Sequence, residues 1–383
     1  MKLGGTMDFE LSEEQKDIQK AAREFAQGEF DPDLTLELDQ NGKFPEAAWK
    51  KAAQLGFIGI FYPEELGGQG LSLLENVLVT ESFCRVDSGI GSALSLVDLG
   101  SELVIKFGSQ EQRAKFLPPL VKGERRLSVA FGESEDDKDL SAMSTVAEKG
   151  EKGYVIRGRK RFVLNAALAD AFIILCQEPV EGWIPLIVEK DENKIEVRPV
   201  EKMSLRMIPS GDLHFQGAWA PPGNRLGKRG EGIDLFHYFH QVMGLRSLAQ
   251  ALGVMEGAFD RAIKYSSQRE QFGRKLSQFQ VIQHKLAEME VGVEVARWLT
   301  YRAATEFDKK EMDTSHLLIA QTEVGRRMTG VVDEALQIFG GYGYIAEQEI
   351  EHYYRDAWAI RKSLGTEEEL KDLLNLKRFG KER

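Results

Sequence analysis

Two short segments in the last third of the sequence carry residue types that suit a phosphate-bearing ligand. Residues 269–273 read Arg-Glu-Gln-Phe-Gly, and residues 337–344 contain three glycines between aromatic side chains. A guanidinium offers several fixed donors that match a diphosphate, and glycine permits close backbone approach because it has no side chain. The plainer interpretation is a surface arginine beside a turn and a glycine turn that interrupts a helix. No strand precedes the glycines, so they are not the fingerprint of a Rossmann fold.

One carboxylate stands out because its neighbours are mostly apolar. Asp98 lies within the segment from Leu94 to Leu103. A buried aspartate is costly unless it is paired or functional, and a carboxylate can accept a proton in a reaction. The alternatives are a helix-capping or loop aspartate, or one paired with a neighbouring cation. The sequence therefore offers Asp98 as a candidate base without deciding between these interpretations.

Composition narrows the class of protein that must position these groups. The chain has 383 residues, a formal net charge of −11 and 42% hydrophobic residues, which suits two or three globular domains. The acidic balance argues against a nucleic-acid partner, and no stretch approaches the roughly 18 apolar residues of a membrane span. The start lacks the apolar region of a signal peptide. Two cysteines fit a reducing compartment, so we expect a cytoplasmic protein. Six scattered histidines predict no metal site.

Periodicity divides the chain into three segments. Residues 1–125 are predicted to form a helical domain that begins with a cap at Ser12. Residues 126–235 contain short β-prone runs separated by glycines and charged turns, which predicts a compact antiparallel β-domain. Residues 236–383 return to long helical patterns, interrupted once by the glycines near residue 340. The expected fold class is thus α+β, mainly α.

The helical, β, helical order coincides with motifs that resemble the acyl-CoA dehydrogenase family. Residues 269–273 are similar to its Arg-x-Gln-Phe-Gly segment, and residues 337–344 to its Gln-x-x-Gly-Gly-x-Gly-Tyr segment. Tyr-Arg-Asp-Ala at 354–357 follows at the family's distance, and Pro-Glu-Glu-Leu-Gly-Gly at 63–68 also matches. The resemblance covers nearly the whole chain.

This resemblance implies a fold, a cofactor and partners. The third domain should be a four-helix bundle, and the protein should be a homotetramer with one FAD per subunit. The substrate should be an acyl-CoA thioester, and electrons should pass to an electron-transferring flavoprotein. The family's matching positions give as cofactor-binding candidates Gly132, Lys138, Phe162, Leu164, Arg269, Gln271, Phe272, Gln337, Gly340, Gly341 and Thr366. They give as substrate-binding candidates Leu245, Arg246, Leu364 and Gly365. For Arg246 an ion pair within the bundle is an equal alternative.

The sequence departs from the family where the flavin is expected. Gly132 replaces the family's threonine and Lys138 its serine, so Lys138 would either contact the cofactor or lie in a solvated loop. Phe162 keeps an aromatic that would pack on the flavin ring, but Leu164 replaces a threonine whose hydroxyl bonds flavin N5. One neutral hydrogen bond contributes only about 0.5–1.5 kcal/mol, so its loss need not prevent cofactor binding.

The sharpest departure concerns the catalytic base. The family's glutamate occurs either at the position of Leu364 or at that of Leu245, and leucine cannot accept a proton. The resemblance places the helix carrying Asp98 at the acyl end of the substrate pocket. Three hypotheses follow: a dehydrogenase whose base is Asp98, for an alicyclic acyl-CoA such as a cyclohexene carboxyl-CoA; a catalytically silent subunit of a mixed oligomer; or a flavin enzyme that eliminates a leaving group.

Overall fold

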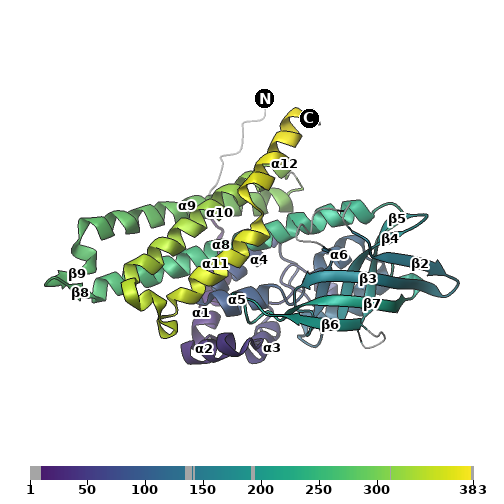
Figure 1. The fold of residues 1–383 in the computed structure, drawn as a ribbon, viewed down its shortest axis with the longest axis horizontal. Helices are drawn as coiled ribbons and strands as arrows, with labels where there is room; N and C mark the ends of the chain where they lie inside the picture. Colours follow the sequence, from purple (N-terminus) through teal and green to yellow (C-terminus); the bar gives the residue numbers. More distant parts are fainter. Residues whose placement is uncertain (1–9, 134–139, 141–142, 191–194, 311, 381–383) are drawn as a thin grey trace.

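The computed structural model describes residues 10–380, except 134–139, 141–142, 191–194 and 311. The helical, β, helical order is confirmed. Figure 1 shows the sheet at one end of the molecule, the long helices extending away from it, and the N-terminal helices beneath both. Within the described residues no helix is both long and apolar enough to cross a bilayer. Nor do those residues contain a group of three or more side chains able to hold a metal ion.

The first N-terminal helix begins at the cap that the sequence predicts. The Ser12 hydroxyl accepts a hydrogen bond from the Gln15 N–H, and the Gln15 side-chain oxygen accepts one from the Ser12 N–H, as expected for a capping box. The helices of this segment are α1 (Glu13–Glu29), α2 (Pro32–Asn41), α3 (Glu46–Gln54), η1 (Glu64–Leu66), α4 (Leu73–Val86), α5 (Ser88–Ser95), α6 (Ser101–Phe107) and α7 (Gln110–Val121). Helix α4 is buried on almost every side because α1 and the C-terminal helices cover it.

The middle segment forms a seven-stranded sheet that corrects one expectation. Its strands are β1 (Leu127–Ala130), β2 (Val146–Gly150), β3 (Gly153–Val163), β4 (Ala171–Glu178), β5 (Gly182–Glu189), β6 (Ile195–Val200) and β7 (Ser210–Ala220). The order is β1-β4-β2-β3-β7-β6, with β5 also on β4. Most pairs are antiparallel as expected, but β1 and β2 both run parallel to β4. The sheet is therefore mixed and not purely antiparallel.

The C-terminal segment is built on one very long helix. Helix α8 (Gly232–Gln268) begins a few residues before the expected limit at 235/236 and packs on α4, α9 and α10. The other elements are η3 (Pro222–Asn224), β8 (Glu270–Gln271), β9 (Arg274–Lys275), η4 (Leu276–Gln278), α9 (Gln280–Asp308), α10 (Thr314–Phe339), η5 (Gly340–Tyr344), η6 (Ala346–Gln348), α11 (Ile350–Leu364) and α12 (Glu367–Phe379). Gly253 lets α8 touch α4, since a Cβ there would lie 2.4 Å from the Glu81 carbonyl oxygen.

Candidate functional site

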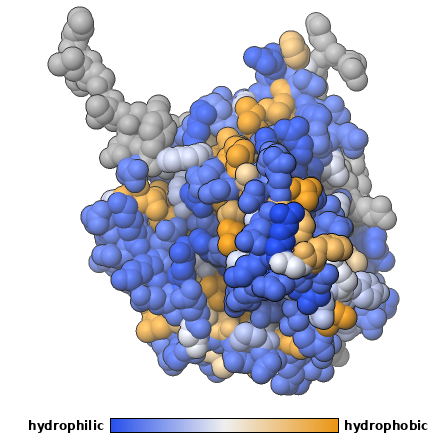
Figure 2. Space-filling model, turned by 90° about the vertical axis from the view of Figure 1, so that its left-hand side faces the viewer, coloured by the Kyte–Doolittle hydropathy of each residue, from blue (hydrophilic) through white to orange (hydrophobic). Residues whose placement is uncertain are grey.

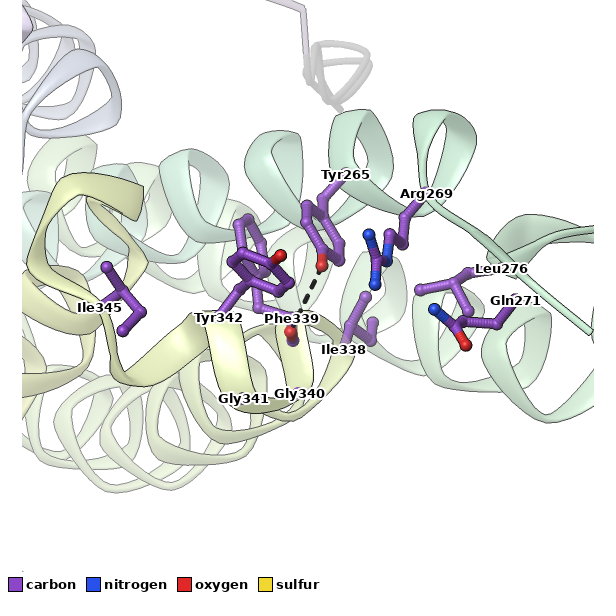
Figure 3. Close-up of a pocket in the computed structure, with 10 residues that line it drawn as sticks. All are labelled: Tyr265, Arg269, Gln271, Leu276, Ile338, Phe339, Gly340, Gly341, Tyr342 and Ile345. Atoms are coloured by element: carbon purple, nitrogen blue, oxygen red, sulfur yellow. Dashed lines mark hydrogen bonds between the residues drawn. The ribbon is translucent and has the colours of Figure 1, made fainter.

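Arg269 and the glycine loop meet at the end of the bundle farthest from the sheet. Arg269 directly follows α8, and Gly340, with φ +56°, ends α10. Between them lies a cavity of about 510 Å³, and Figure 3 shows the Arg269 and Gln271 side chains on one side of it and Gly340 and Gly341 on the other. Tyr265 stacks on Phe339 with ring centroids 4.1 Å apart and so fixes the distance between the two helices.

This cavity fits the diphosphate part of a dinucleotide. Among the described residues no carboxylate forms an ion pair with Arg269, whose guanidinium lies 5.2 Å from the Tyr342 ring centroid. A Cβ added at Gly340 or Gly341 would meet nothing within 4 Å, so the floor of the cavity is open backbone. Gln337 is exposed and does not line the cavity, and Phe272 is 92% exposed. The structure thus brings together four of the expected cofactor residues, Arg269, Gln271, Gly340 and Gly341.

The residues expected at the flavin lie on the sheet, around the ends of β1 and β3. Phe162 has φ +52°, its N–H donates to Asp212 Oδ1 at 3.0 Å, and its ring is 55% exposed. The carbonyl of Leu164 accepts a hydrogen bond from Ser128 Oγ at 2.6 Å, and that of Gly132 accepts one from the Arg161 N–H at 2.9 Å. These bonds fix the backbone of both strand ends. Lys138 lies outside the described residues.

A buried ion pair holds the end of β1 against β3. Lys160 Nζ donates to Glu133 Oε1 at 2.6 Å and to the Phe131 carbonyl at 2.9 Å. Burial lowers the pKa of Lys160, and the Glu133 carboxylate opposes this effect. Glu133 also accepts hydrogen bonds from the backbone of Ser144 and Thr145. Glu133 therefore ties the end of β1 to the residues that directly precede β2.

The two leucines that the sequence analysis expects at the family's glutamate positions are fully buried. Leu364 is the last residue of α11, and its carbonyl accepts a hydrogen bond from Gln321 Nε2 at 3.0 Å. Gly365 follows with φ +103°. Leu245 lies inside α8. Thr366, expected at the cofactor, accepts the Glu369 N–H at 3.2 Å, so its hydroxyl caps α12.

Asp98 and Arg246 are brought together across 148 residues of sequence. Arg246 Nη1 lies 2.9 Å from Asp98 Oδ1, and both side chains are buried. Asp98 Oδ2 accepts hydrogen bonds from Tyr62 Oη at 2.8 Å and Ser101 Oγ at 3.3 Å. Donors to a carboxylate stabilise its charged form. These contacts are those of the ion-pair alternative that the sequence left open for both residues.

Glu102 is a member of this cluster that the sequence analysis did not single out. Its Oε2 accepts from Arg246 Nη2 at 3.3 Å and from the Gly100 N–H at 3.2 Å, while its buried Oε1 has no partner among the described residues. Burial raises the pKa of Glu102, against the opposing charge of Arg246. The only signal in the sequence was a second acid four residues after Asp98.

Known protein families match this chain over most of its length. Three family models match in order: the acyl-CoA dehydrogenase N-terminal domain over residues 12–124, the middle domain over 128–218 and the C-terminal domain over 230–375. The chain is 33% identical over 365 residues to 3-(aryl)acrylate reductase of Clostridium sporogenes, covering 94% of this chain and 96% of that protein. It is 34% identical to the Caffeyl-CoA reductase-Etf complex subunit CarC of Acetobacterium woodii, covering 90% and 93%.

A solved structure shows the same fold over nearly all of both chains. Butyryl-CoA dehydrogenase of Megasphaera elsdenii superposes with a TM-score of 0.92 at 31% identity, covering 97% of this chain and 100% of that chain. These matches confirm the expected fold class, FAD as the cofactor and an oxidoreductase of CH–CH bonds as the enzyme class. The chain belongs to the acyl-CoA dehydrogenase family.

Proposed function

We propose that this chain is an FAD-dependent acyl-CoA oxidoreductase whose proton-transfer group is displaced to the buried cluster around Asp98. The observation that supports the proposal is the full burial of Leu364 and Leu245, the two residues expected from the resemblance to replace the family's glutamate. Bound FAD supplies the hydride acceptor, so a side chain must still take the proton that leaves the neighbouring carbon. Asp98 is a buried carboxylate that forms an ion pair with Arg246, the residue after Leu245 in α8.

FAD is proposed to bind between two copies of the chain within a homotetramer. Arg269 and the glycine loop lie at the outer end of the bundle, where Figure 2 shows hydrophobic residues among hydrophilic ones. Phe272 and Tyr344 there are 92% and 91% exposed. Phe162, which would pack on the flavin ring, lies near the end of β3 in the sheet, whereas the bundle end that carries Arg269 points away from the sheet (Figure 1). A single copy therefore places the two parts of the cofactor site far apart, and a second copy brings them together.

The acyl group is proposed to carry a ring, with an alicyclic acyl-CoA such as a cyclohexene carboxyl-CoA as the first candidate. An aspartate displaced from the usual base positions suits proton removal at a ring carbon farther from the thioester. The names of the aryl-acrylate and caffeyl-CoA relatives support a ring-bearing acyl group. The relative from an Etf complex supports an electron-transferring flavoprotein as the electron partner.

A visible absorption spectrum of the purified protein tests the proposal first. We expect the yellow colour of oxidised flavin and bleaching with alicyclic or aryl-substituted acyl-CoAs. Asp98→Asn should retain FAD and bind the same acyl-CoA but slow flavin reduction by at least about 10²-fold, the lower end of general-base contributions. Bleaching by Asp98→Asn at the wild-type rate would remove Asp98 from the mechanism.

A second candidate function is a catalytically silent subunit of a mixed oligomer. The three hydrogen-bond donors on Asp98 favour it, because they stabilise the carboxylate as a structural partner of Arg246. This candidate predicts protein that gives no bleaching with any acyl-CoA, whether or not FAD is bound. It also predicts that activity appears only after co-expression with a second member of the family.

A further inference from the structure

Two buried carboxylates share one guanidinium at the junction of α6 and α8. Asp98 accepts from Arg246 Nη1 at 2.9 Å and Glu102 from Nη2 at 3.3 Å, and the side chains of all three are at least nine-tenths buried. If both carboxylates were ionised, the cluster would hold one uncompensated negative charge in a medium of low dielectric. Buried charges are paired or neutralised because removing them from water is costly.

The contacts indicate which carboxylate is neutral. Asp98 receives three donors, from Arg246, Tyr62 and Ser101, and these donors favour its charged form. Glu102 has a buried Oε1 with no donor in the described part of the chain. A carboxylate oxygen without a donor is poorly stabilised when it carries charge. The proton of the cluster therefore resides on Glu102.

Glu102 also lies on the route from Asp98 to the surface. Lys106 follows Glu102 by about one turn in α6. The side chain of Lys106 is exposed, and its Nζ lies 3.6 Å from the Tyr238 ring centroid. Helix α6 therefore leads from the buried carboxylate of Glu102 to solvent within one turn.

We propose that Asp98 and Glu102 act as one proton-transfer pair, in which Glu102 holds a proton at rest and releases it outward as Asp98 receives one. The inference rests on the proposed function, in which the proton from the substrate C–H bond goes to the Asp98 carboxylate. Glu102 then loses its own proton to solvent. Only protons move in this exchange, and no further oxidant or reductant is needed.

The exchange keeps the charge of the cluster constant. Before it, the cation of Arg246 faces ionised Asp98 and neutral Glu102; afterwards it faces neutral Asp98 and ionised Glu102. The released charge on Glu102 is met by two donors already in place, Arg246 Nη2 and the Gly100 N–H. Without Glu102, a proton on Asp98 would leave the buried guanidinium with no anion. The pair can therefore accept a proton where Asp98 alone would do so poorly.

Infrared spectroscopy of the ligand-free protein tests the resting proton without depending on activity. In the difference spectrum between wild type and Glu102→Gln, we expect a carbonyl stretch of a protonated carboxylic acid that shifts in heavy water. Glu189→Gln is the matched control, because Glu189 is a buried glutamate held by Lys115 and Arg125 and should contribute no such band. Glu102→Asp should move the band rather than abolish it, which keeps the test available if the glutamine variant folds poorly. A difference spectrum without this band would overturn the inference.

Flavin reduction measured with an acyl-CoA that wild type accepts tests the functional half. Glu102→Gln should keep its FAD content and acyl-CoA affinity, slow reduction about tenfold or more and shift the pH profile of the rate. Glu189→Gln should match wild type in all of these. If Asp98→Asn is slow while Glu102→Gln has the wild-type rate and pH profile, the proposed function stands and the proton pair is refuted. If Asp98→Asn keeps the wild-type rate, the proposed function itself fails.

Discussion

The stability of this protein should depend on pH through one buried histidine, His352 in α11. Its Nε2 lies 3.1 Å from Asp87 Oδ2, at ion-pair distance although not in hydrogen-bond geometry, and both side chains are buried. Burial lowers the pKa of His352, but Asp87, then Asp356 and Asp39, outweigh it and raise the pKa from 6.5 to about 9. The charged imidazolium therefore stabilises the fold.

The direction and size of the effect follow from linkage. A pKa raised in the folded state contributes stability that is fully present below pH 6.5 and is lost as the pH rises through about 9. The difference of 9 − 6.5 = 2.5 units corresponds to at most about 3 kcal/mol, at 1.36 kcal/mol per unit. For a domain of 150–250 residues, each kcal/mol of stability shifts Tm by roughly 2–4 °C. Because this chain is longer, we expect its Tm shift per kcal/mol to lie at the lower end of that range.

Thermal unfolding of wild type and His352→Gln between pH 6 and pH 10 measures this contribution. We expect the variant to be less stable at pH 6, and the Tm difference to shrink as the pH approaches 10. His284→Gln, at an exposed histidine on α9, controls for loss of an imidazole elsewhere. A Tm difference that stays constant over the whole range would refute a charged His352, because a pH-independent loss reports packing only.

Three further outcomes test other parts of the structure. Arg269→Ala should lower FAD occupancy, since a charge-assisted contact contributes about 1.5–3 kcal/mol. Arg274→Ala, in the hairpin that follows Arg269 but outside the cavity, should leave FAD occupancy unchanged. Flavin-to-protein absorbance ratios of the purified variants measure both outcomes. Butyryl-CoA and octanoyl-CoA should bind but reduce the flavin very slowly in stopped-flow assays, and Leu364→Glu should partly restore the rate; ordinary turnover by wild type would contradict this. Gly253→Ala should lower Tm, because its Cβ would lie 2.4 Å from a carbonyl oxygen of α4; an unchanged Tm would show that the helices can separate there without cost.

Much of the architecture could be predicted because its signals are local. A serine followed three residues later by glutamine is enough to start α1, and the change from helical to alternating periodicity marks the sheet. The parallel pairing of β1 with β4 could not be predicted, because a four-residue strand buried at every position carries no alternation that would indicate its neighbour. Strand order depends on contacts between distant segments, which one sequence does not display.

The candidate site divides in the same way. Arg269 and the glycine loop were identified because both segments match motifs of the family in the expected order, although each alone has a plainer interpretation as a surface arginine or a turn. The Asp98–Arg246 pair was not foreseen as a pair, because it joins residues 148 positions apart. Glu102 was missed since an acid in a short helix usually faces solvent; only its buried ion pair with Arg246 shows that this one does not.

The length of α8 has a consequence for how active sites assemble. Arg246 lies within it and Arg269 directly follows its last residue, and 269 − 246 = 23 residues at 1.5 Å each separate the two by about 35 Å along one rod. If FAD lies between two copies as proposed, Asp98 of one copy serves the same cofactor as Arg269 of the neighbouring copy. Two inactive proteins, one carrying Asp98→Asn and the other Arg269→Ala, should then regain part of their activity when they are mixed into one oligomer. Such complementation would be impossible if each chain held a complete site of its own.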